Sequence, residues 1–146
     1  MQSKITTGLL VFIVAFLANC AWEFFHSYLY IHYRGAPITP TVLLHAALFD
    51  AIIITVFLLP AMMRDFSRKY FWSAICIAVL FAIGLERFAL ETSRWAYTDA
   101  MPIVPIIHTG LTPTIQLGFL VWLSGTIVSY AVSRWHSRRM RIVPSA

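Results

Sequence analysis

Four long apolar segments, separated by short polar stretches, constrain this chain more than any other feature of its sequence. A helix needs about 20 residues to cross a bilayer, and each segment is apolar around its whole circumference, as a membrane span must be. Only 12% of the residues are charged, whereas soluble domains carry about 25%. We therefore predict an all-α integral membrane four-helix bundle, a single transmembrane domain over residues 1–146, with spans at Ile5–Phe25, Val42–Met62, Tyr70–Leu90 and Thr114–Ser133.

The basic residues indicate how this bundle is oriented. Positive side chains collect in cytoplasmic loops, and here they gather before the first span, between the second and third, and after the fourth, at Lys4, Arg64, Arg68, Lys69, Arg134, Arg138, Arg139 and Arg141. The other two loops hold only Arg34 and Arg94. We therefore predict a multi-pass protein of the cell inner membrane, with both termini cytoplasmic and loops 27–41 and 92–113 on the periplasmic side.

The net charge of +5 belongs mostly to the predicted cytoplasmic side. Such a charge suits anionic lipid headgroups, so membrane lipids are the expected partners. No motif supports nucleic-acid binding. A second copy of the chain is a possible partner, because the sequence leaves open whether the protein forms a homo-oligomer. Loop 92–113 has an apolar centre, MPIVPII. Because apolar surface is unstable in water, we expect an apolar outer lid between spans three and four, folded back on the bundle or on the membrane surface.

Ionisable and amide side chains gather near the outer ends of the spans. At a helix rise of about 1.5 Å per residue, residues from different spans fall at similar depth, while the inner half contains almost nothing ionisable. Each intramembrane ionisable residue costs about 2.5–3.5 kcal/mol on insertion scales and marks function by default. The pattern predicts an outward-facing pocket lined by Glu23, His26, His45, Asp50 and Glu86, with Asn19 and Gln116 orienting them.

Glu23 and His26 form a Glu-x-x-His pair on one helix face. Carboxylate-bridged metal sites in helix bundles take two ligands from one helix at this spacing. With His45 and Asp50, the pair predicts a metal site for a divalent transition metal, Zn or Fe. Further candidate ligands are Glu86, Glu91 and His108. The alternative is that Glu23 and His26 hydrogen-bond each other or pair with an arginine, Arg87 or Arg94.

Asp50 is the most deeply placed carboxyl group, roughly 12 Å into the second span by the same rise, with no basic neighbour in its own span. It needs a partner, which can be Asn19, Arg87, a metal or water in a cavity. A purely structural hydrogen bond stays the alternative. On the third span, one helix face is shared by Arg87, Glu91 and Arg94. This spacing predicts a ladder of ion pairs that fixes the end of the helix.

Aromatic residues flank the predicted pocket. Trp22 lies in the same helical stripe as Glu23 and is a pocket candidate. Four others fall at the outer interface, where an aromatic belt is expected in any membrane protein: Tyr28, Tyr30, Trp95 and Tyr97. The predicted substrate-binding residues are Asn19, Trp22, Gln116 and Trp95.

Several short motifs stand together: Trp22-Glu23-x-x-His26, Trp95-Ala96-Tyr97 followed by Met101-Pro102, and Gly110-Leu111-x-Pro113-x-x-Gln116. In this combination the chain resembles an uncharacterised group of small four-span bacterial inner-membrane proteins. The resemblance implies a four-span bacterial membrane protein and carries no catalytic role with it.

Three functions compete at this point. The first is an enzyme that performs metal-assisted or general acid–base chemistry on a lipid-like molecule, with Glu23, His26, Asp50 and Glu86 as the catalytic candidates. The second is a protein that binds or transports a transition metal with the same ligands. The third is a non-catalytic membrane subunit in which the polar cluster locks the helices together or binds a partner.

Overall fold

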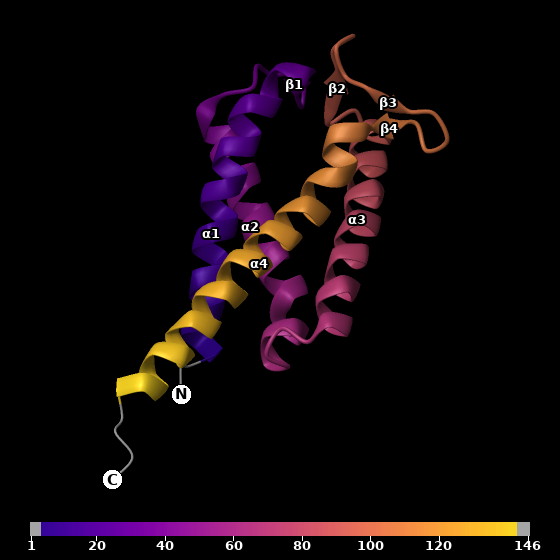
Figure 1. Cartoon of the computed structure of the whole chain (residues 1–146). Coiled ribbons are helices and arrows are strands. Elements are labelled where there is room, and N and C mark those ends of the chain that lie inside the picture. The colour runs from indigo at the N-terminus through magenta and orange to yellow at the C-terminus, as the bar shows by residue number, and fades with distance from the viewer. Residues whose placement is uncertain (1–3, 143–146) are drawn as a thin grey trace.

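The computed structural model describes residues 4–142, which form four long helices and four short strands (Figure 1). Each helix is long and apolar enough to cross a membrane, so the predicted all-α bundle of a multi-pass membrane protein is confirmed. The helices are α1 (Lys4–His26), α2 (Pro40–Met63), α3 (Arg68–Glu91) and α4 (Leu111–Ile142). Three of them match the predicted spans within a few residues, whereas α4 begins three residues earlier than Thr114 and runs beyond Ser133 into the basic segment.

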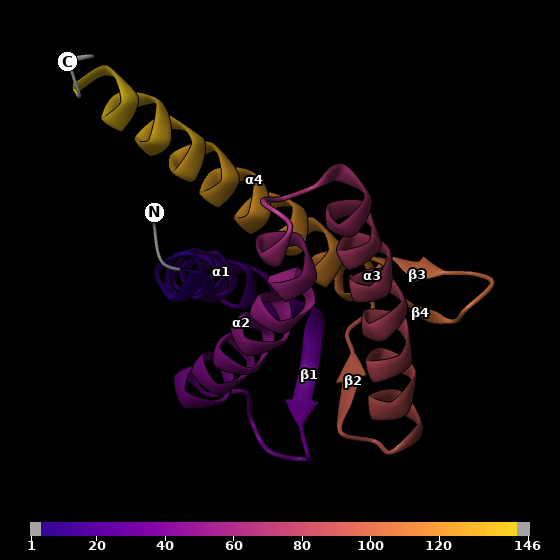
Figure 2. The ribbon, with the colours of Figure 1, turned by 90° about the horizontal axis from the view of Figure 1, so that it is seen from below.

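The two ends of the bundle differ in structure. The chain enters α1 and leaves α4 at the same end, which we call the terminal end (Figure 1). The opposite end, called the loop end, carries the strands and the connections from α1 to α2 and from α3 to α4. Figure 2 shows α2 and α3 diverging there, with β1 between them. At this end α2 begins with Thr39, whose hydroxyl accepts a hydrogen bond from Val42 N at 3.4 Å, followed by Pro40 in the first turn.

Small residues allow the helices to approach closely. Buried alanines occupy the inner faces of the first three helices, among them Ala15, Ala51 and Ala78. On α4, a Cβ atom added to Gly118 would collide with Val79, and one added to Gly125 would collide with the ring of Phe71. Small residues at helix contacts are the usual basis of packing in membranes, where lipid is as apolar as the side chains. The α3–α4 interface therefore depends on these two glycines.

The strands at the loop end are a feature that the sequence pattern does not predict. β1 (Tyr30–Tyr33) pairs antiparallel with β2 (Trp95–Tyr97), and β3 (Ile103–Val104) pairs antiparallel with β4 (Thr109–Gly110). The β1–β2 ladder joins the first long loop to the second, and it satisfies backbone groups that would otherwise lie unpaired beside apolar surroundings.

The expected apolar lid is divided between two places. The β1–β2 pair lies over the loop end, whereas β3 and β4 form a hairpin that projects sideways from the bundle in both ribbon views (Figures 1 and 2). Met101, at the base of this hairpin, is buried, but Ile106 at its tip is 91% exposed. The apolar centre of the loop therefore does not cover the bundle, because the hairpin directs it outward, and its contact with the membrane surface stays a prediction.

The glycine contacts lead to a prediction about stability. Gly118→Ala and Gly125→Ala should each lower the thermal unfolding midpoint of the purified protein in detergent, because overpacking costs about 1–3 kcal/mol. Gly84→Ala on α3 is the matched control, since its added Cβ meets nothing within 4 Å, and Ala favours a helix over Gly by roughly 0.5–1 kcal/mol. Equal midpoints for all three variants would contradict the close approach of α3 and α4.

Candidate functional site

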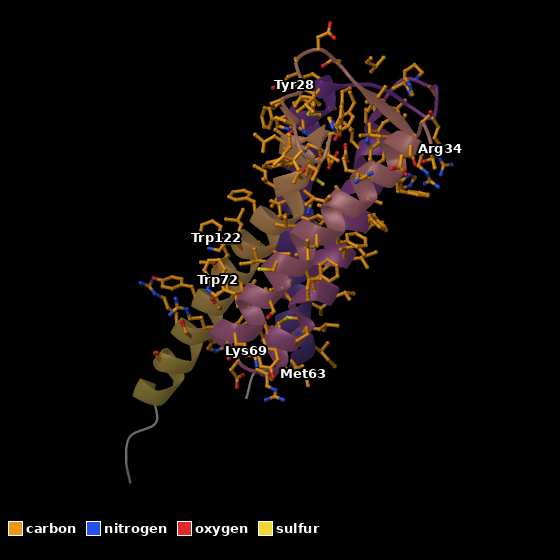
Figure 3. All side chains as sticks on the ribbon, turned by 90° about the vertical axis from the view of Figure 1, so that its right-hand side faces the viewer. Tyr28, Arg34, Met63, Lys69, Trp72 and Trp122 are labelled. Carbon is orange, nitrogen blue, oxygen red and sulfur yellow. The ribbon has the colours of Figure 1, made fainter. Side chains whose placement is uncertain are left out.

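A cavity of about 410 Å³ lies among the helices at the loop end. Its wall includes the three intramembrane carboxyl groups that the sequence places at one depth, Glu23, Asp50 and Glu86. Figure 3 places Tyr28 and Arg34 at this end of the molecule, and Met63 and Lys69 at the other. We call the cavity lined by these three carboxyl groups the chamber. The rest of its wall comes from His26, Ser27, Tyr30, His32, Tyr33, Ile38, Val42, Leu43, His45, Ala46, Phe49, Ala82, Leu85, Arg94, Trp95, Pro113, Gln116 and Leu117.

Gln116 on α4 connects two of the carboxyl groups. Its Nε2 atom donates to Glu23 Oε1 at 2.7 Å and to Asp50 Oδ2 at 3.0 Å, and lies 3.4 Å from Asn19 Oδ1. An amide nitrogen has two hydrogens, so the two shorter contacts, both to carboxyl oxygens, are the principal ones. The amide of Asn19 donates to Ala15 O at 2.8 Å, which turns its oxygen toward Gln116. One side chain thus joins α1, α2 and α4.

Glu86 on α3 forms the second polar centre. Its Oε1 atom accepts hydrogen bonds from the Tyr97 hydroxyl, from Trp95 Nε1 at 3.0 Å and from the Tyr30 hydroxyl at 3.5 Å. The Tyr97 hydroxyl in turn accepts from Gly110 N at 2.7 Å. These contacts attach the β1–β2 pair, and Gly110 of β4 directly before α4, to α3. We call the β1–β2 pair the cover of the chamber, and its attachment depends on Glu86.

The two tyrosines remain hydrogen-bond donors at physiological pH. Burial raises the pKa of Tyr30 above its ordinary value, and the neighbouring Glu86 carboxyl acts in the same direction. Burial also raises the pKa of Tyr97, and the hydrogen bond from Tyr97 to Glu86 acts in the same direction with a smaller effect. Both hydroxyls are therefore protonated and available to the carboxyl group.

His26 does not bond to Glu23, although the two share a helix face. Glu23 bonds to Gln116, whereas His26 Nε2 lies 2.6 Å from the Thr112 hydroxyl on α4. The His26 ring also packs edge-on against Tyr30, with ring centroids 5.2 Å apart. The i, i+3 spacing thus places both side chains in the wall but gives each a different partner.

The predicted metal ligands are not assembled as a metal centre. Among the described residues, no three His, Cys, Asp or Glu side chains are arranged to hold a metal ion. The predicted set of Glu23, His26, His45 and Asp50 all reach the chamber wall, but His45 lies on an exposed face of α2 and His26 turns to Thr112. The further candidate His108 is exposed in the β3–β4 connection and is absent from the wall.

Two predicted substrate-binding residues lie behind the wall rather than in it. Asn19 is fully buried and contacts Gln116. Trp22 packs against Phe119 with ring centroids 6.0 Å apart, and its buried Nε1 atom has no hydrogen-bond partner in the part of the chain that the structure describes. Gln116 and Trp95 do line the chamber.

The predicted ion-pair ladder on α3 forms only in part. Arg87 and Glu91 pair at 3.4 Å on the exposed face of the helix. Arg94 does not extend this ladder, because α3 ends at Glu91 and the chain turns. Its guanidinium lies over the Phe88 ring, 4.9 Å from the centroid, and the residue lines the chamber.

Sequence reasoning missed the residues that the strands bring to the site. Tyr30 and Tyr97 fit an aromatic belt equally well, and their contact with Glu86 follows from the β1–β2 register, in which they are paired. Thr112 has no distinguishing pattern around it. The available signal was the clustering of aromatic residues near an intramembrane carboxyl group.

Comparisons with known proteins give no relative for this chain: no family model, no curated protein and no solved structure matches it. The resemblance to small four-span bacterial proteins therefore stays a prediction. The site has to be interpreted from its own geometry.

The Glu86 centre leads to a prediction. Tyr97→Phe removes a donor to Glu86 and the acceptor for Gly110 N, and such losses cost about 1–3 kcal/mol when a buried partner is left unsatisfied. The thermal unfolding midpoint should fall clearly below that of wild type. Tyr28→Phe is the control, because Tyr28 lies at the same end and its side chain is exposed. Indistinguishable midpoints for the two variants would show that Tyr97 does not anchor the cover.

Proposed function

We propose that this protein is a membrane enzyme that performs general acid–base chemistry on the head group of a lipid-like molecule held in the chamber. The single observation that carries the proposal is the pair of hydrogen bonds from Gln116 Nε2 to Glu23 and Asp50 inside a cavity. In the orientation predicted from the basic residues, the chamber opens in the periplasmic half of the inner membrane.

Two neighbouring carboxyl groups can divide acid and base roles. One member can take a proton from the bound molecule as a general base, and the group that is then protonated can return a proton as a general acid. Gln116 fixes one oxygen of each group, and the remaining oxygens, Glu23 Oε2 and Asp50 Oδ1, have no hydrogen-bond partner among the described side chains and backbone. Each group therefore keeps a free oxygen with which it can exchange a proton with a bound molecule.

The exposed residues on the α2 side of the chamber support the entry of a molecule from the lipid. Of the residues in the wall, His45 and Phe49 are the exposed ones, and at i, i+4 they share one face of α2. Both lie within a helix that is long and apolar enough to span the membrane. The loop end is covered by β1 and β2. A molecule with an apolar tail can thus leave its tail in the lipid beside Phe49 while its head reaches the carboxyl pair.

The experiment is a search for lipid conversion by the purified protein. Wild-type protein is reconstituted into vesicles made from a total lipid extract of the expression host, and the lipids are followed over time by mass spectrometry. We expect one species to be consumed and a product to appear. Glu23→Gln and Asp50→Asn should slow this conversion at least about 100-fold, because a general acid or base contributes about 10²–10⁴.

The control is Glu91→Gln, which removes an exposed carboxyl group at the same end of the molecule and outside the chamber. It should convert lipid at the wild-type rate. Wild-type turnover in Glu23→Gln and Asp50→Asn would refute the assigned roles. No conversion by wild type, together with a stoichiometric transition metal that is lost in both variants, would favour the metal-binding alternative instead.

A further inference from the structure

We propose that the chamber selects a molecule with a primary ammonium head group, which donates one hydrogen bond to each of Glu23, Asp50 and Glu86. This inference rests on the proposed function, because it names the head group of the molecule that the chamber holds. Three features of the chamber carry it: its charge balance, its free acceptor atoms and its aromatic wall.

The first feature is an excess of acidic groups. Three carboxyl groups line the chamber, and Arg94 is the one Lys or Arg residue in the wall. Two ion pairs of the described residues, Lys4–Asp65 and Arg87–Glu91, lie outside the chamber. The Arg94 guanidinium is instead placed over Phe88. Buried charges are normally paired, so the chamber accommodates a cation better than a neutral or an acidic molecule.

The second feature is the set of acceptor atoms that the protein leaves free. The hydrogen bonds from Tyr30, Trp95 and Tyr97 to Glu86 all reach Oε1, so Oε2 has no donor among the described residues. Glu23 and Asp50 each bond to Gln116 through one oxygen and keep the other. Asp50 and Glu86 are 9% and 4% exposed, yet their free oxygens are not among the buried atoms that are sealed off without a partner. These oxygens therefore face space inside the chamber.

A primary ammonium group matches this set of acceptors. It carries three N–H donors and no acceptor, one donor for each free carboxyl oxygen. A hydroxyl group has a single donor and no charge. A quaternary ammonium group has the charge but no donor, so it would leave the three free carboxyl oxygens without a hydrogen bond.

The third feature is the aromatic part of the wall. Tyr30, Tyr33 and Trp95 come from the β1–β2 cover, and Phe49 comes from α2. Aromatic faces attract cations within about 6 Å of the ring centroid. The cover thus contributes further cation binding above the carboxyl groups, while Phe49 and Leu85 offer an apolar path for the tail between α2 and α3.

The test compares three molecules with the same tail: radiolabelled dodecylamine, dodecanol and dodecyltrimethylammonium. The full-length protein is placed in nanodiscs of phosphatidylcholine, which contain no primary amine, and retention is measured against empty nanodiscs. We expect dodecylamine to bind the protein at least about tenfold more tightly than either of the other two, as hydrogen bonds to charged groups imply. Equal binding of dodecanol or of dodecyltrimethylammonium would overturn the proposal.

Variants locate the binding. Glu86→Gln and Asp50→Asn, which keep the side-chain shape, should each weaken dodecylamine binding about tenfold, while Glu91→Gln should leave it unchanged. Undiminished binding in the first two variants would overturn the proposal. The ligand series on wild type requires no variant, so the test stands even if a variant fails to fold. Lipid conversion without amine selectivity would refute this inference and leave the proposed function standing. Amine selectivity without lipid conversion would refute the proposed function and leave the amine-binding chamber standing.

Discussion

The structure depends on one amide group placed between two carboxyl groups in an apolar bundle. Gln116 holds Glu23 of α1 and Asp50 of α2 with hydrogen bonds of 2.7 and 3.0 Å. Buried polar groups without partners cost several kcal/mol, so this contact fixes how three helices meet. It also leaves part of each carboxyl group unsatisfied, which is what a purely structural contact would avoid. The same feature therefore specifies the fold and points to a ligand.

The fourth helix and the cover are attached through a separate centre. Glu86 binds residues of both β1 and β2, so the two loops at this end become one layer over the chamber. α3 and α4 are in close contact at Gly118 and Gly125, and Glu86 of α3 and Gln116 of α4 both line the chamber. The terminal half of the bundle is packed mainly by apolar residues, among them Leu58, Ala74 and Val128, which concentrates the polar chemistry at the other end.

The spans, and the depth shared by Glu23, Asp50 and Glu86, were predictable from the sequence. Long apolar segments allow few alternatives in a membrane, and a constant rise per residue places side chains along each helix. The partner of each side chain was not predictable in the same way. His26 turns to Thr112 rather than to Glu23, which depends on how α1 and α4 cross. Tyr30 and Tyr97 reach Glu86 through strands of four and three residues, too short to show a periodic pattern.

The most direct measurement of the central contact is a double-mutant cycle between Glu23→Gln and Asp50→Asn, read as unfolding free energies. Residues in one hydrogen-bond network show interaction energies of about 0.5–3 kcal/mol, and we expect a value in that range for two carboxyl groups that share Gln116. A parallel cycle between Asp50→Asn and Glu91→Gln should be additive, because Glu91 lies outside the chamber. Additivity of Glu23→Gln and Asp50→Asn would contradict a shared site.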